Sequence, residues 1–155
     1  MDKEQNKIGE TFQTNAMITL PKLLEEFYLH DPVKEDPEAL HQLRICAKRL
    51  RYSLELYEPC YGNRLDSYID NIKSLQEVLG AIHDCDVMLE FLQAQSSKIS
   101  QKYDSTKIEC GFDYTIADFK RKRKKYVEEF FHLWHSKYES NFKEELLKVI
   151  LNPSH

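Results

Sequence analysis

The stretch LHQLRICAKRLRYSLELY, residues 40–57, sets two parallel rows of side chains on one predicted helix. One row is apolar and recurs every three or four residues, which is the spacing of a helix face that enters a core. The other row follows the same spacing and is cationic. A cationic row therefore runs beside the predicted core face. The apolar row is Leu40, Leu43, Ala47, Leu50, Leu54 and Tyr57, and the cationic row is His41, Arg44, Lys48 and Arg51.

The residues that flank this stretch fix the ends of the helix. Asp36 has the character of an N-cap and Pro37 suits the first helical position, while Pro59 and Gly62 end the pattern, so we expect a helix over 37–58. Apolar spacing predicts further helices over 11–30, 63–95 and 110–150, with a kink or break at Pro21 and a mobile connection over 96–107. The sequence therefore predicts an all-α protein, an antiparallel four-helix bundle over residues 11–151 that follows a frayed segment at 1–10.

Composition limits the classes of partner. The chain has a formal net charge of −4 and a pI of 5.9, which argues against a nonspecific nucleic-acid coat. The local concentration of cations instead favours a compact anion that docks at one place. No apolar run reaches 18 residues, and the four cysteines lack metal-site spacing, so we expect a soluble cytoplasmic protein without membrane spans, cofactor or metal.

Two more segments carry candidate binding residues. On the helix over 63–95, Lys73, Gln76 and His83 track one edge, and Asp84 and Asp86 stand close by to orient cationic side chains. In the run KRKRKK, residues 120–125, only Arg123 falls on the apolar seam, with Lys120 and Lys124 beside it. A buried guanidinium without a partner is costly, so Arg123 must meet an acid or an anion. The alternative for the first two segments is a solvated helix face with ordinary local pairing. For Arg123 the alternative is a partner within the protein, Asp84 or Asp86.

Together these pieces resemble the CHAD family, an α-helical domain that binds inorganic polyphosphate. His41, Arg44, Arg49 and Arg51 match the H-x-x-R…R-x-R pattern of the family, and the segment 72–87 resembles its L-G-x-x-R-D-x-D-V signature. His83 stands where the signature has Arg, which would make that phosphate donor pH-dependent. The family architecture of two bundles around a basic channel is about twice this length, so the resemblance implies one half of it, completed by a homodimer or weaker in binding.

The leading hypothesis is non-catalytic binding of polyphosphate or a similar polyanion in a basic groove. A metal-dependent phosphohydrolase of the HD type is the runner-up and would use His41, His83, Asp84 and Asp118 as ligands. A helical module that binds an acidic protein partner is the third reading. The leading hypothesis assigns no catalytic or metal-binding residue, and its candidate polyphosphate-binding residues are His41, Arg44, Lys48, Arg49, Arg51, Lys73, Gln76, His83, Lys120, Arg123 and Lys124.

Overall fold

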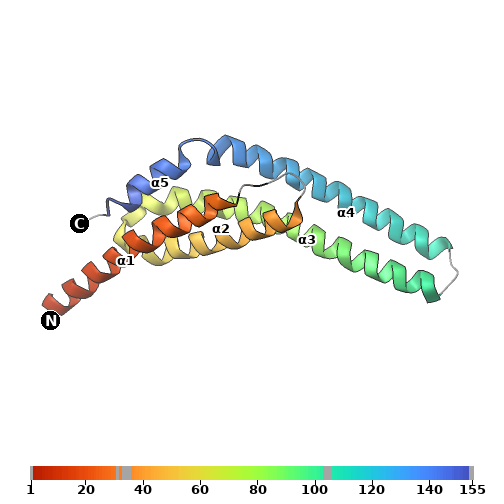
Figure 1. Cartoon of the computed structure of the whole chain (residues 1–155), viewed down its shortest axis with the longest axis horizontal. Coiled ribbons are helices and arrows are strands. Elements are labelled where there is room, and N and C mark those ends of the chain that lie inside the picture. Colours follow the sequence, from red (N-terminus) through yellow and green to blue (C-terminus); the bar gives the residue numbers. More distant parts are fainter. Residues whose placement is uncertain (1, 31, 33–35, 103–105, 154–155) are drawn as a thin grey trace.

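The computed structural model describes residues 2–30, 32, 36–102 and 106–153. These residues form five α-helices and no strand, which confirms the all-α class (Figure 1). Within the same residues, no helix is long and apolar enough to span a membrane. The helices are α1 (Asp2–Leu29), α2 (Pro37–Tyr57), α3 (Asp66–Lys102), α4 (Thr106–Leu133) and α5 (Phe142–Ile150).

Helix α2 begins where the sequence predicts it. The Asp36 carboxylate accepts a hydrogen bond of 3.0 Å from the backbone N–H of Glu38, and Pro37 occupies the first turn, where its missing N–H removes no helical bond. The helix is followed by two short 3₁₀ turns, Glu58–Cys60 and Gly62–Leu65. Gly62 adopts a positive φ of 58°, which lets the chain reverse into α3.

Two expectations for the first three helices need correction. Helix α1 begins at Asp2, upstream of Thr11, and continues through Pro21 without the predicted break. Proline removes only one helical hydrogen bond, and the buried Leu20 and Leu24 hold the helix to the core on both sides of it. Helix α3 extends to Lys102, so most of the predicted connection over 96–107 is helical. Residues 103–105 of that connection lie outside the described residues, and a frayed segment at 1–10 stays a prediction.

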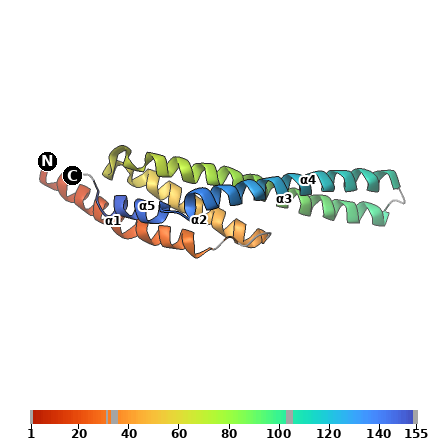
Figure 2. The same ribbon diagram turned by 90° about the horizontal axis from the view of Figure 1, so that it is seen from above.

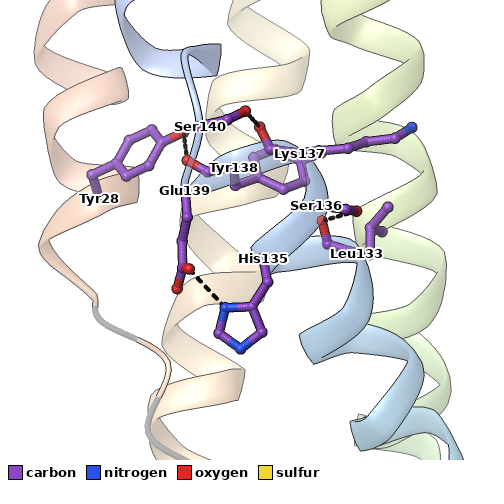
Figure 3. Close-up of polar contacts among 8 residues, drawn as sticks. All are labelled: Tyr28, Leu133, His135, Ser136, Lys137, Tyr138, Glu139 and Ser140. Atoms are coloured by element: carbon purple, nitrogen blue, oxygen red, sulfur yellow. Dashed lines mark hydrogen bonds and ion pairs between the residues drawn. The ribbon is translucent and has the colours of Figure 1, made fainter.

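The predicted fourth helix over 110–150 is wrong in one respect, because it is interrupted. Helix α4 ends at Leu133, a π-helical turn follows over Trp134–Tyr138, and α5 begins at Phe142. The hydroxyl of Tyr28 on α1 donates a 2.9 Å hydrogen bond to the backbone carbonyl of Tyr138 (Figure 3). Burial raises the pKa of Tyr28, so its hydroxyl keeps the proton that it donates. This tertiary bond helps fix the turn that sends α5 back against α1.

The helices divide the molecule into a compact part and an arm. Helices α1, α2, α5 and the first half of α3 pack together, whereas the end of α3 and the start of α4 extend beyond them side by side (Figures 1 and 2). We call residues 86–102 of α3 and 106–122 of α4 the arm. Among the described residues, the buried side chains of α3 end at Cys85 and those of α4 begin at Val127. The apolar core therefore lies in the compact part and in the end of α4 from Val127 onward, and a four-helix bundle stays an interpretation of these elements.

Candidate functional site

The cation row of α2, defined as His41, Arg44, Lys48 and Arg51, lies at the edge of the core. Its four side chains are partly exposed, whereas the apolar row of the same helix is buried. Because the two rows share one helical spacing, burial of one holds the other along the rim. Within the described residues, no carboxylate lies within ion-pair distance of Arg44 or Lys48, and Arg51 only approaches Glu55, at 3.6 Å.

Helix α3 faces the cation row along the edge that the sequence indicates. The imidazole rings of His41 and His83 are stacked, with centroids 4.9 Å apart and planes inclined by 27°. One helical turn earlier on α3, Gly80 lies beneath Arg44, since a Cβ added there would sit 4.0 Å from the Arg44 Nε. That distance is an ordinary contact, so Gly80 does not have to be glycine for the helices to approach. It does show that Arg44 crosses α3 next to the histidine pair.

Four buried polar atoms around the cation row have no hydrogen-bond partner within the described residues. Leaving such an atom unsatisfied costs about 1–3 kcal/mol, so proteins rarely keep several together without a purpose. All four belong to residues that the sequence singled out, and they come from three different helices. They are His41 Nδ1 and Arg51 Nε on α2, Gln76 Oε1 on α3, and Arg123 Nη2 on α4.

Arg123 connects α4 to this region. Its Nε donates to the Asp86 carboxylate of α3, and the two side chains are only 16% and 24% exposed. The sequence required Arg123 to meet an acid or an anion, and Asp86 supplies the acid. Only one edge of the guanidinium is used in this pair. Its buried Nη2 stays available to donate a hydrogen bond to a second, anionic partner.

The basic run of α4 is divided between two faces of the helix. Arg121 and Lys122 lie on the outer face and pair with Asp118, at 2.7 and 2.9 Å. Hydrogen bonds from Lys122 and Arg121 lower the pKa of this exposed carboxyl. On the other face, Lys120, Arg123 and Lys124 line a cleft of about 730 Å³, which we call the α4 cleft. Its further lining residues are Val127, Glu128, Phe131 and His135.

The other predicted site residues lie in different surroundings. Arg49 is 57% exposed and pairs with Glu26 of α1 at 3.0 Å, so the structure does not bring it to the cation row. Lys73 is exposed on α3, and within the described residues it has no ion-pair partner. Two residues that lie beside these cations were not among the site residues predicted from the sequence. The Tyr52 ring lies 4.5 Å from the Arg51 guanidinium carbon, and His135 enters the α4 cleft one turn after Phe131.

The ligand set of a metal-dependent phosphohydrolase is not brought together. His41 and His83 meet, but Asp118 pairs with cations on the outer face of α4. The described residues contain no group of three or more His, Cys, Asp or Glu side chains placed to hold a metal ion. The geometry instead brings together cationic side chains and hydrogen-bond donors.

Comparison with protein families gives one result. The family model of the CHAD domain matches residues 6–93, more than half of the chain. The matched segment includes the cation row, the histidine pair and Asp86, whereas the α4 cleft lies outside it. Searches of curated proteins and of solved structures find no match.

Proposed function

The chain belongs to the CHAD domain family, and on that premise we propose that it binds inorganic polyphosphate, without catalysis, through the cation row and the helices that face it. The observation that carries this proposal is the set of buried polar atoms without a hydrogen-bond partner on His41, Arg51, Gln76 and Arg123. Phosphate oxygens accept hydrogen bonds from imidazole and guanidinium groups with charge assistance. Rotation of the Gln76 amide by half a turn presents a donor to the same ligand.

The charges of the site support a polymeric anion. Like charges along one helix face repel, and nothing within the described residues neutralises Arg44 or Lys48. From His41 to Arg51 the row extends about 15 Å at 1.5 Å per residue, which is longer than a single phosphate. A linear polyphosphate would contact several of these cations at once.

The proposed ligand-binding residues come from three helices. His41, Arg44, Lys48 and Arg51 of α2 form one wall, Lys73, Gln76 and His83 of α3 the second, and Lys120, Arg123 and Lys124 of α4 the third. We leave Arg49 out of this set because its guanidinium pairs with Glu26. Arg123 links the two regions, because its Nε pairs with Asp86 beside the histidine pair while its side chain lines the α4 cleft.

A titration with long-chain polyphosphate at several salt concentrations tests the proposal. Each cation that replaces a counterion adds about 0.7–0.9 to the slope of log affinity against log salt. We therefore expect saturable binding at low salt that weakens steeply as salt rises. Absence of binding at low salt would contradict the proposal. Metal analysis and phosphate-release assays on the same sample separate binding from the phosphohydrolase reading.

An acidic protein partner would use the same cations, and the test can tell the two ligands apart. Any partner retained by the chain should be released by an enzyme that degrades polyphosphate if the polymer is the ligand. Retention after that treatment would favour the protein partner. We propose the reducing cytoplasm as the compartment of this binding, since the four cysteines are free thiols.

We further propose that a second copy completes the groove, as the two-bundle family architecture implies. The arm carries exposed apolar side chains, among them Val87 at 52%, Phe91 at 55% and Tyr114 at 74%. Such side chains mark a surface on which another copy can pack. Sedimentation with and without polyphosphate should reveal a dimer, and a monomer under both conditions would overturn this part of the proposal.

A further inference from the structure

The stacked histidines of α2 and α3 have a consequence for how the site responds to pH. We propose that binding of a polyanion loads protons onto the His41–His83 pair, so that affinity rises as pH falls. This inference rests on the proposed function and names a regulation of the same site. The geometry that carries it is the stacking of the two rings, 4.9 Å apart, together with the buried and unpartnered His41 Nδ1.

The charged groups around the histidine pair explain why a bound anion would favour its protonation. From α2, Arg44 lies one turn along from His41 and carries a fixed positive charge. From α3, Asp86 lines the same small hollow as the two rings, but its carboxylate accepts from Arg123 of α4. The rest of that hollow is apolar, formed by Pro37, Leu40, Leu79 and Ile82. An imidazolium pair here would face two guanidiniums and one carboxylate that is already engaged.

Two imidazoliums stacked beside these arginines would repel each other and the guanidiniums. A polyanion on the cation row removes that repulsion and accepts hydrogen bonds from both protonated rings. The bound state therefore holds more protons than the free state. By linkage, affinity increases on acidification and is lost as pH rises through the range in which imidazole titrates, roughly pH 5 to 8.

The size of the effect follows from the number of protons taken up. Each proton bound with the ligand changes the affinity by up to about tenfold per pH unit. Because two imidazoles can each take up a proton, the affinity can change by more than the tenfold per pH unit that a single histidine allows. The sequence pattern alone, with His83 considered by itself, does not predict that second proton.

The test measures polyphosphate affinity from about pH 5.5 to 8.5 at constant ionic strength. A long polymer is used because its chain ends, which titrate near neutral pH, are then a small share of its charge. Calorimetry in two buffers of different ionisation heat counts the protons directly. We expect an uptake of between about one and two protons in the lower half of the range, and none at its upper end.

Three variants separate the causes. His83→Gln should lower the proton uptake by half or more and flatten the pH profile, whereas His132→Gln, at an exposed position of α4, should leave both unchanged. His83→Arg supplies a permanent charge and should bind more tightly than wild type at high pH, with a shallower slope. It also serves if the glutamine variant does not fold, which circular dichroism reports.

The outcomes distinguish the two proposals. Binding that is indifferent to pH, or a proton uptake that His83→Gln leaves intact, would overturn the inference while polyphosphate binding stands. Absence of binding at every pH would overturn both.

Discussion

The cation row of α2 and the cations of the outer faces consist of the same residue types in different surroundings. Arg51 is 18% exposed and has a buried Nε without a hydrogen-bond partner. Arg49, two positions away, is 57% exposed and pairs with Glu26. Lys143 similarly pairs with Glu25, and Arg121 with Asp118. The comparison teaches that Arg49, Arg121 and Lys143 are neutralised by nearby carboxylates, whereas within the described residues Arg44 and Lys48 of the cation row have no ion-pair partner.

The largest effect on polyphosphate affinity should come from substitution of Arg51, compared with the same substitution of Arg49. Arg51→Ala removes a donor from the cation row, and a hydrogen bond to a charged group contributes about 1.5–3 kcal/mol. We expect polyphosphate affinity to fall by about 10- to 100-fold. The matched variant Arg49→Ala removes the same charge from the outer face and should change affinity by less than about twofold. Equal losses of affinity in the two variants would contradict the assignment of Arg51, and not Arg49, to the site.

A second prediction concerns stability and compares Arg123 with Arg121. Arg123→Ala leaves the largely buried Asp86 carboxylate without its partner, which should lower the free energy of unfolding by about 2 kcal/mol. Arg121→Ala breaks an exposed pair and should leave the urea midpoint unchanged within error.

The double variant Arg123→Ala with Asp86→Ala tests the stated cause. If the loss arises from the unpaired carboxylate, removal of Asp86 should restore most of the stability. Two losses that simply add would show that Arg123 stabilises the arm by packing instead.

The smallest effect should appear in the salt dependence. Lys73→Ala removes one exposed cation from the α3 wall, so the slope of log affinity against log salt should become shallower by roughly one. Lys143→Ala removes a cation that Glu25 already neutralises and should keep the wild-type slope. The two slopes are measured in one titration series. A shallower slope for Lys143→Ala would mean that the outer cations also contact the polymer.

The features that follow local rules could be predicted from the sequence. The spacing of the two rows, the Asp36 cap and the Arg123 partner each depend on a few neighbouring residues or on the cost of an isolated charge. The meeting of His41 and His83 also agrees with the edge assigned to α3. For these features, helical spacing and the cost of an unpaired buried charge allow few alternative arrangements.

The remaining features depend on tertiary contacts. The sequence around the interruption after Leu133 contains no proline or glycine, and Trp134 and Tyr138 keep helical spacing, so the pattern predicts a continuous helix. The structure instead has a hydrogen bond from the Tyr28 hydroxyl to the Tyr138 backbone carbonyl at this turn. Arg49 matches a family motif, but it lies roughly 200° around the helix from Arg51, so it faces α1. Pro21 was expected to kink or break α1, and the helix continues through it because the packing of its neighbours offsets the lost hydrogen bond.

The most direct measurement follows the side-chain N–H signals of the six arginines during a polyphosphate titration. Arginine labelled with nitrogen-15 gives one Nε–Hε signal per residue, assigned by single substitutions. We predict that the signals of Arg44, Arg51 and Arg123 shift and saturate together, while those of Arg49 and Arg121 stay in place. The signal of Arg64, whose exposed guanidinium donates to the Asn152 backbone carbonyl away from the cation row, should also stay in place. Shifts spread equally over all six, or confined to the outer three, would contradict a polyphosphate site on the cation row.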